Sequence, residues 1–320
     1  MTVFFVAVAP PGRAMAAGGL DAASQELVFD AHPDAQDPGV EEVMVHLGGV
    51  RVHALCTPGP TEVLLLHGED STAETWRSVL QRLVGRVGAC AYDRLGSGQS
   101  RPAPEARGWY ELLDEFRRIH RALGADPPYV LVGQGLGGLY AHVYAGDRPL
   151  DVEGLVLVEP AHGDLVPGMR TGMPEAEWDA WSERRNRPNG DGVVERRIAE
   201  RTGRLGSTTI PVTVLTATRR RDGDGWNARF ANEAARRVHE SVVRGLTLGR
   251  HVPVERSGPL VQRDAPDRVA EEIMRVVEAA RSTRGTYRGT RSMPARVGRT
   301  SRASKPTRYR AASLVSALPR

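Results

Sequence analysis

The sequence predicts an α/β fold in which helices cover both faces of a mostly parallel sheet. Short apolar runs such as Glu62 to Leu66 and Tyr129 to Val132 are typical of strands that are buried on both faces. Amphipathic stretches such as Trp109 to Leu123 stand between these runs, and strands that alternate with helices favour a parallel sheet. The 320 residues suffice for one such domain of about 250 residues with extra terminal segments, or for two smaller domains.

A hairpin is expected at the start of the regular structure. Val43 to Leu47 and Val50 to Cys56 alternate as strands do, and they flank Gly48-Gly49, which favours a tight turn. Segments with the period of a strand or of a helix then follow one another, and together with the hairpin they predict eight strands. The later strands are expected at 62–66, 87–92, 129–132, 155–158, 212–216 and 251–255, and the helices near 72–83, 109–123, 136–145, 227–244 and 266–281.

Residues 161–208 interrupt this alternation. They carry many charges, the turn-forming Pro188-Asn189-Gly190 and two tryptophans with helical spacing, Trp178 and Trp181. We expect a small helical cap here, inserted into a domain that spans residues 41–281.

The two ends of the chain differ in composition from this domain. Residues 1–40 are rich in Ala, Gly, Pro and Asp and show no period, so we expect a flexible leader. Residues 282–320 are expected to form a disordered basic tail. Residues 281–320 hold 11 of the 43 basic groups and no acid, which leaves 32 basic against 39 acidic groups in the rest. An acidic body gives no support for nucleic-acid binding by the fold, while the tail suits a weak contact with an anionic partner.

Cysteine content and hydropathy bear on cofactors and location. Cys56 and Cys90 make no disulfide framework and no metal-ligand spacing, so we interpret both as small core residues and predict neither a cofactor nor a metal. No apolar run approaches the roughly 20 residues of a transmembrane helix. The start, MTVFFVAVAPPGRAMAAGG, has a short apolar stretch and an A-x-A-like AMA but lacks a basic n-region. We therefore predict a cytoplasmic protein, with secretion as the alternative.

Four short motifs stand, in order, at the ends of predicted strands. They are Leu64-Leu65-Leu66-His67-Gly68, Tyr92-Asp93-Arg94-Leu95-Gly96-Ser97-Gly98-Gln99-Ser100, Gly133-Gln134-Gly135-Leu136-Gly137-Gly138, and Ser257-Gly258 ahead of Gln262-Arg263-Asp264-Ala265-Pro266. In this order the motifs resemble the α/β-hydrolase superfamily, above all the branch of esterases, epoxide hydrolases and haloalkane dehalogenases with a small helical cap. The resemblance covers about residues 43–281 and implies the α/β-hydrolase fold.

The resemblance implies a nucleophile where this chain has Gly135. In the G-x-S-x-G nucleophile elbow the middle residue is lifted out of a strand-to-helix turn toward the substrate. Glycine offers no hydroxyl, thiol or carboxylate, so no covalent intermediate can form there. It does adopt freely the backbone geometry that other residues resist by roughly 1–3 kcal/mol. We therefore expect a preserved turn with a vacant nucleophile position.

The resemblance also implies a base and an acid. The family places a histidine directly after Ser257-Gly258, where this chain has Pro259, so the base position is vacant as well. His251, earlier in the same segment, is expected to be a packed or surface histidine. For the acid we favour Glu159, which ends a predicted strand, and the alternatives are Asp222 and Asp224 after the next strand.

Backbone groups would form the oxyanion hole of such a site. The family geometry assigns this role to the N–H groups of Glu69 and Leu136, which are independent of side-chain identity. We expect His67 to be a structural residue of its loop, and Asp93 and Arg94 to brace the loop after their strand.

Together these residues favour a degenerate α/β-hydrolase that keeps a pocket for a small, largely apolar ligand. Trp178 and Trp181 would either roof that pocket or pack the cap onto the domain, and His162 would supply a polar contact. The alternative is an active hydrolase or lyase that acts on a small ester-like molecule through a non-standard site, with Glu159 and His162 as its acid–base pair.

Overall fold

The computed structural model describes residues 27–28, 39–103, 107–202, 205, 208–219 and 226–289. The chain forms two compact units, Met1–Ser282 and Thr283–Arg320. Every strand described below belongs to the first unit. The second unit is described only through residues 283–289.

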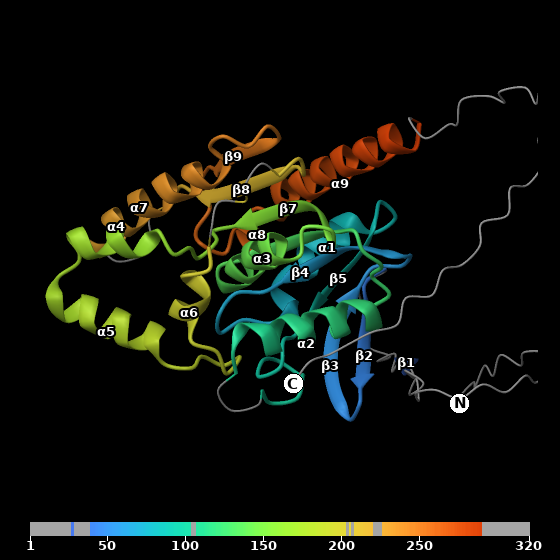
Figure 1. The fold of residues 1–320 in the computed structure, drawn as a ribbon, viewed down its shortest axis with the longest axis horizontal. Coiled ribbons are helices and arrows are strands. Elements are labelled where there is room, and N and C mark those ends of the chain that lie inside the picture. Colours follow the sequence, from blue (N-terminus) through green and yellow to red (C-terminus); the bar gives the residue numbers. More distant parts are fainter. Residues whose placement is uncertain are drawn as a thin grey trace, which may run out of the picture. The chain divides into compact units, whose positions relative to one another are not determined.

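In the described part of the chain, nine strands form one sheet in the order β1-β2-β3-β5-β4-β6-β7-β8-β9 (Figure 1). The pairs β1–β2, β2–β3 and β3–β5 are antiparallel, and the remaining pairs are parallel. The predicted mostly parallel sheet is confirmed, and the two-residue β1 adds a ninth strand to the eight expected. The strands are β1 Leu27–Val28, β2 Glu41–Leu47, β3 Val50–Cys56, β4 Thr61–Leu66, β5 Gly88–Tyr92, β6 Tyr129–Gln134, β7 Val152–Val158, β8 Val212–Ala217 and β9 Gly249–Val254.

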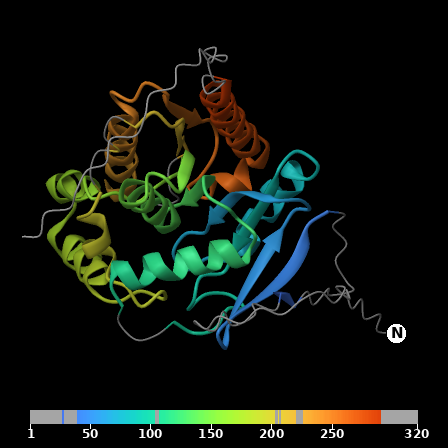
Figure 2. The same cartoon turned by 45° about the vertical axis from the view of Figure 1, so that its right-hand side comes forward.

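Helices cover both faces of the sheet, because the side chains of each central strand alternate between two buried clusters. In β6, Tyr129 and Leu131 belong to one cluster and Val130 and Val132 to the other. The helices are η1 Ala73–Trp76, α1 Arg77–Leu83, α2 Trp109–Ala122, α3 Leu136–Asp147, α4 Leu165–Gly172, α5 Glu175–Asn186, α6 Glu195–Ala199, α7 Trp226–Val243, α8 Val261–Asp264 and α9 Pro266–Gly289. Helices α2 and α3 pack into the first cluster, and α1 and α9 pack into the second (Figure 2).

Three helices, α4, α5 and α6, lie between β7 and β8 in the segment where a helical cap was predicted. In Figure 1 they gather beside the sheet, at the left of the view. An isolated bridge between Pro188 and Val194 closes the turn that joins α5 to α6. That this segment acts as a cap over a pocket stays a prediction.

The interpretation of the two cysteines as separate core residues was wrong. Strands β3 and β5 are antiparallel and their register pairs Cys56 directly with Cys90. The two Cα atoms lie 4.2 Å apart and the sulfur atoms are bonded to each other. The two cysteines are 34 residues apart in sequence and meet on neighbouring strands, a pairing that a count of cysteines could not reveal. Disulfides persist mainly in oxidising compartments. This bond therefore argues against the cytoplasmic location, which stays a prediction.

The last helix is longer than the sequence pattern suggested. Helix α9 runs to Gly289, past the expected end at residue 281, because no proline interrupts it after Pro266. None of the helices in the described ranges has the length and apolar composition to cross a bilayer.

Candidate functional site

The turn between β6 and α3 has the shape that the sequence predicted for residues 133–137, which we call the elbow. Gly135 sits between strand and helix with φ 54° and ψ −117°, and Leu136 opens α3. A Cβ on Gly133 would lie 2.3 Å from the Gly137 carbonyl oxygen, and a Cβ on Gly137 would lie 2.4 Å from the carbonyl oxygens of Leu66 and His67. The two flanking glycines are therefore required by close approach of the backbone to β4 and α3.

The position of Gly135 differs from that of its two flanking glycines. A Cβ built there would stand 3.8 Å from the Cα of Gly68, which is an ordinary contact. The backbone is fixed on both sides, since the Gly135 N–H donates to the Val158 carbonyl at 3.0 Å and the Ala161 N–H donates to the Gly135 carbonyl at 2.9 Å. Space for a side chain is present, and the positive φ is the feature that favours glycine.

Glu159 directly follows β7 and is one of few non-glycine residues described with a positive φ, at 47°. Its backbone N–H donates to the Leu215 carbonyl at 2.9 Å, and its carboxylate Oε1 accepts the Ala217 N–H at 2.5 Å. The carboxylate is thus tied to the end of β8. Strained backbone that is held by its surroundings is common at functional sites. The alternative acids, Asp222 and Asp224, lie outside the described residues.

Residues 255–260, which we call the base loop, join β9 to α8 and contain Pro259. The Gly258 N–H donates to Oδ2 of Asp264 at 2.7 Å, which anchors the loop to α8. The Gln134 side chain reaches from the elbow and donates from Nε2 to the Pro259 carbonyl at 3.4 Å. The base loop therefore lies beside the elbow, but proline brings only a carbonyl oxygen to that contact. His251 sits in β9, where its Nε2 pairs with Oγ1 of Thr216 at 2.9 Å.

Residues 67–72, which we call the oxyanion loop, begin with a buried histidine. Burial, reinforced by the nearby Arg94 charge, lowers the pKa of His67 to about 3, so the ring is neutral at pH 7. Its Nδ1 lies 2.8 Å from the Gly68 carbonyl and must carry the proton in that bond. Nε2 then accepts, and the Arg94 backbone N–H lies 3.3 Å away. His67 thus serves as a structural residue of its loop.

The family of this chain follows from its sequence as well as from this geometry. A family model of the α/β-hydrolase fold matches residues 62–237, more than half of the chain. The chain belongs to the α/β-hydrolase family. The match includes the elbow and Glu159, and the base loop lies beyond its end.

Curated relatives of this α/β-hydrolase match it over short stretches. The uncharacterized protein YqjL of Bacillus subtilis is 26% identical over 122 residues, which are 38% of this chain and 48% of that protein. Lipase LipV of Mycobacterium tuberculosis is 35% identical over 106 residues, 32% of this chain and 38% of the lipase. Monoacylglycerol lipase abhd6-B of Xenopus laevis is 32% identical over 104 residues, 31% of this chain and 30% of the lipase. The alignments thus span less than half the length of these relatives.

Solved structures match this α/β-hydrolase over most of its length. A haloalkane dehalogenase loop variant from Bradyrhizobium elkanii superimposes with a TM-score of 0.57 at 14% identity, over 77% of this chain and 99% of that one. A thermophilic esterase from Thermogutta terrifontis gives a TM-score of 0.53 at 17% identity, over 75% and 96%. At such identity the likeness establishes the shared fold alone.

Arg94 ties the oxyanion loop of this α/β-hydrolase to the segment between α5 and α6. Its buried guanidinium donates to the carbonyls of His67 at 2.5 Å and Gly68 at 3.1 Å. Its Nε donates to Oδ2 of Asp191 at 3.0 Å, and the Tyr140 hydroxyl donates to the same carboxylate oxygen at 3.0 Å. The bracing role that the sequence suggested for Arg94 thus acts through a carboxylate 97 residues away.

Asp93 braces the other side of the same motif. Its Oδ1 accepts the Ala73 N–H at 2.7 Å and its Oδ2 accepts the Gln99 N–H at 2.9 Å. The ring of His53 lies 2.8 Å from Oδ2 through Nδ1 and 2.7 Å from Glu42 through Nε2. This array fixes the start of η1 against the loop after β5.

A small cavity of about 200 Å³ opens beside the elbow. Leu136 and Glu69, the expected oxyanion-hole residues, both line it together with His67, Ser97 and Asp191. Burial, and then the neighbouring carboxylates of Glu195 and Asp70, raise the pKa of Glu69. The structure thus brings together the elements that the family geometry assigns to anion binding.

Ser97 forms a serine–histidine contact that sequence reasoning missed. Its Oγ lies 3.0 Å from Nε2 of His67, in the same cavity as Leu136. The same hydroxyl can donate to the Arg94 carbonyl at 2.8 Å, which competes for its proton. A pKa of about 3 makes His67 too weak a base to ionise a serine efficiently near pH 7. Only the glycine-flanked serine in Gly96-Ser97-Gly98 hinted at this contact.

The three candidate ligand residues divide between two neighbouring cavities. Trp178 and Trp181 line one of about 400 Å³, which we call the tryptophan cavity, with ring centroids 5.3 Å apart. His162 lines another of about 550 Å³, where its ring lies 5.2 Å from that of His142. Asp164 and Thr202 line both cavities, which places them side by side. Burial lowers the pKa of His162. Within the described residues no cluster of His, Cys, Asp or Glu could hold a metal ion.

Proposed function

We propose that this α/β-hydrolase is a binding protein for a small, largely apolar ligand and does not hydrolyse esters through a catalytic triad. The observation that carries the proposal is Gly135, at the point of the elbow with φ 54°. Triad hydrolysis begins with attack by a side-chain oxygen or sulfur, and glycine has neither. No acyl-enzyme can form at this position.

The base loop supports the same proposal. Pro259 takes the position where related hydrolases carry a histidine, and its ring nitrogen can neither accept nor donate a proton. Loss of one triad member leaves a residual rate from the oxyanion hole and from binding, and the losses are not additive. With Gly135 and Pro259 at the nucleophile and base positions, Glu159 would have no histidine at position 259 to orient.

The preserved parts of the site support a binding role. The cavity beside the elbow, which Glu69 and Leu136 line, and the separate tryptophan cavity provide enclosed space for a ligand. Indole rings supply broad apolar contact area, and the tryptophan cavity, at about 400 Å³, has the size of small-molecule sites. Lipases among the relatives favour an ester-like ligand.

A comparison of variants on short p-nitrophenyl esters tests the proposal. The wild type should give no turnover above the buffer rate, and Gly135→Ser/Pro259→His should hydrolyse the esters. Gly135→Ala/Pro259→His is the matched control, because it adds the same Cβ and the same histidine without the hydroxyl, and it should stay inactive.

Two results would count against the proposal. Turnover by the wild type that is lost in Glu159→Gln or His162→Ala would show an enzyme with a non-standard site. A folded but inactive Gly135→Ser/Pro259→His protein would show that the site no longer keeps the geometry on which a retained pocket depends.

A further inference from the structure

The tryptophan cavity, of about 400 Å³, is lined by residues of one segment, 163–202, between β7 and β8. Trp178, Trp181 and Arg185 of α5 line it, together with Val166 of α4 and Ala199 of α6. The elbow, the oxyanion loop and the base loop are all described, and none of their residues lines this cavity. The cavity is therefore separate from the place where triad chemistry would occur.

Arg185 brings a buried positive charge to the wall of this cavity. The residue is 6% exposed. Its Nε donates to Oε1 of Glu195 at 2.9 Å, and its Cζ lies 4.6 Å from the centre of the Trp181 ring. The guanidinium is thus held at its Nε edge by a carboxylate and on one face by an aromatic ring, and these two contacts fix its direction.

The two terminal nitrogens of this guanidinium are left over. Neither Nη1 nor Nη2 of Arg185 makes a hydrogen bond to any residue in the described part of the chain, and neither is among the polar atoms that are shut off from water. Since Arg185 lines the cavity and is otherwise buried, these nitrogens open into the cavity. Buried donors are nearly always paired, so a water or a ligand in the cavity supplies the acceptor.

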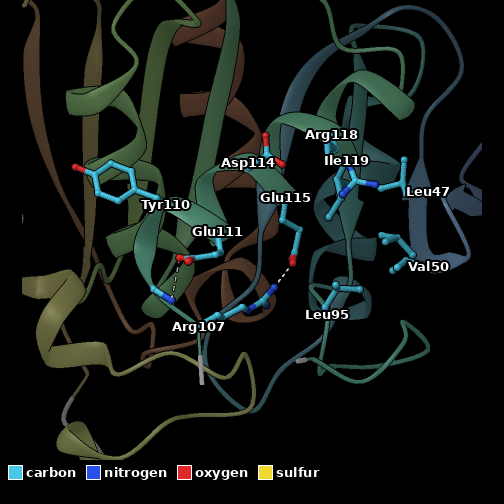
Figure 3. A pocket seen from close by; sticks show the side chains of 12 residues that line it. Leu47, Val50, Leu95, Arg107, Tyr110, Glu111, Asp114, Glu115, Arg118 and Ile119 are labelled. Carbon is cyan, nitrogen blue, oxygen red and sulfur yellow. Dashed lines mark hydrogen bonds and ion pairs between the residues drawn. The ribbon is translucent and has the colours of Figure 1, made fainter. Parts of the chain in front are cut away.

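A second buried arginine shows the opposite case. In a larger cleft of about 770 Å³ along α2, Arg107 reaches to Glu115, with which it forms an ion pair (Figure 3). Nη2 of Arg107 has no hydrogen-bond partner among the described residues, but it is shut off from water and no ligand can reach it. The comparison singles out Arg185 as an arginine whose unused donors are within reach of a ligand.

The charges around Arg185 favour a neutral acceptor. Glu195 already balances the charge of Arg185, and Arg196 in the same wall pairs with Glu200 at 2.9 Å. Asp164, whose side chain is 73% exposed, adds a further negative charge to the lining. A carboxylate ligand would therefore lose its hydration without meeting an excess of positive charge. An ammonium group could not accept a hydrogen bond from Arg185.

We propose that the tryptophan cavity binds a small, neutral aromatic carbonyl compound, such as a ketone, ester or amide, whose carbonyl oxygen accepts from Nη1 and Nη2 of Arg185. A carbonyl oxygen has two lone pairs and no proton, so it satisfies both donors at once. The aromatic ring lies against Trp178 and Trp181, which supply apolar contact area. This inference rests on the proposed function, because it names the chemical class of the small, largely apolar ligand and its place.

A titration of the full chain with acetophenone tests the site, followed through the indole N–H signals of the five tryptophans in NMR spectra. Ethylbenzene and benzoate at pH 7 are the matched probes, since the first lacks the carbonyl oxygen and the second carries a charge there. Acetophenone should shift the signals of Trp178 and Trp181 and bind roughly tenfold more tightly than either matched probe. It has no ester bond, so its binding is measured independently of any hydrolysis.

Variants separate this site from nonspecific binding. Arg185→Met/Glu195→Gln removes the donors without leaving a buried charge unpaired, and it should weaken acetophenone roughly tenfold, to the level of ethylbenzene. Arg184→Met changes an exposed arginine of the same helix outside the cavity wall and should not alter the affinity. Ser182→Phe fills the cavity from α5 and should abolish binding while the Arg185–Glu195 pair remains.

Three results would overturn this inference: no binding of acetophenone, equal affinity for acetophenone and ethylbenzene, or acetophenone binding that is unchanged in Arg185→Met/Glu195→Gln. Turnover of p-nitrophenyl esters by the wild type is a different result, because it would overturn the proposed function and not the role of Arg185.

Discussion

The oxyanion loop differs from the elbow and the base loop in the side chains that it carries. The oxyanion loop is held by a buried guanidinium, a neutral imidazole and a paired carboxylate, all connected by short hydrogen bonds. The elbow and the base loop carry Gly135 and Pro259 at the positions proposed for the nucleophile and the base. The contacts of His67, Arg94 and Asp191 hold the oxyanion loop, whereas the two positions proposed for chemistry carry residues without a reacting side chain.

This difference shows that the shape of such a site and its chemistry rest on separate residues. Arg94, His67 and Asp191 fill buried space and pair with backbone, so their loss would destabilise the fold. Under the proposed function, a nucleophile at position 135 and a base at position 259 would carry out no such structural task, because the sheet, the turn and the loops form with Gly135 and Pro259 in those positions. A match to the family therefore reports the scaffold, while activity depends on particular side chains.

The largest expected effect is a loss of stability when Arg94, which holds the oxyanion loop, is replaced. Arg94→Met leaves Asp191 buried without its partner, since the two side chains are 1% and 4% exposed. The free energy of unfolding should fall by about 3–5 kcal/mol, as measured by urea denaturation. Arg86→Met, an exposed arginine, is the control and should stay close to wild type. A loss at Arg94 no larger than that of the control would refute the structural role assigned to the pair.

Two glycines of the elbow, Gly135 and Gly137, differ in the space that a side chain would find. Gly137→Ala would press a methyl group against two backbone carbonyls at 2.4 Å, and should cost roughly 3 kcal/mol. Gly135→Ala meets only an ordinary contact at 3.8 Å and pays for its positive φ alone, about 1–2 kcal/mol. Chemical denaturation of both variants would check the order, and the reverse order would mean that position 135 has no room for a side chain.

A smaller effect is expected from His67 as the pH falls. Its pKa is about 3 in the folded protein against about 6.5 in an unfolded chain, so between these values the unfolded state binds the proton. Stability therefore falls as the pH drops below about 6.5, by about 2 kcal/mol at pH 5 from this group. His67→Gln should remove that share of the difference between urea unfolding at pH 7 and at pH 5. An unchanged difference in this variant would mean that His67 is not held neutral by its surroundings.

The sequence was sufficient for the parts of this site that depend on local order. The β6–α3 turn follows from an apolar strand, glycines at alternate positions and a helix in direct succession. Glu159 was placed correctly at the end of β7 because a strand's last residue can be read from its apolar run. The proximity of Pro259 to the elbow followed from the family pattern rather than from any local signal.

The contacts that were missed join distant parts of the chain. The Cys56–Cys90 bond depends on the register of β3 against β5, and the Arg94–Asp191 pair depends on how the segment between α5 and α6 folds back. Likewise, His162, Trp178 and Trp181 were expected around one pocket, but His162 lines a different cavity from the two tryptophans. Each of these contacts is decided by tertiary packing, which periodicity and composition do not encode.

The most direct measurement of the central claim is intact-mass spectrometry after incubation with a fluorophosphonate, which labels activated serine nucleophiles covalently. The wild type should keep its mass, and Gly135→Ser/Pro259→His should gain one adduct that maps by peptide digestion to residue 135. An adduct on the wild type, at Ser97 or at any other serine, would contradict the account by showing an activated nucleophile in the native protein.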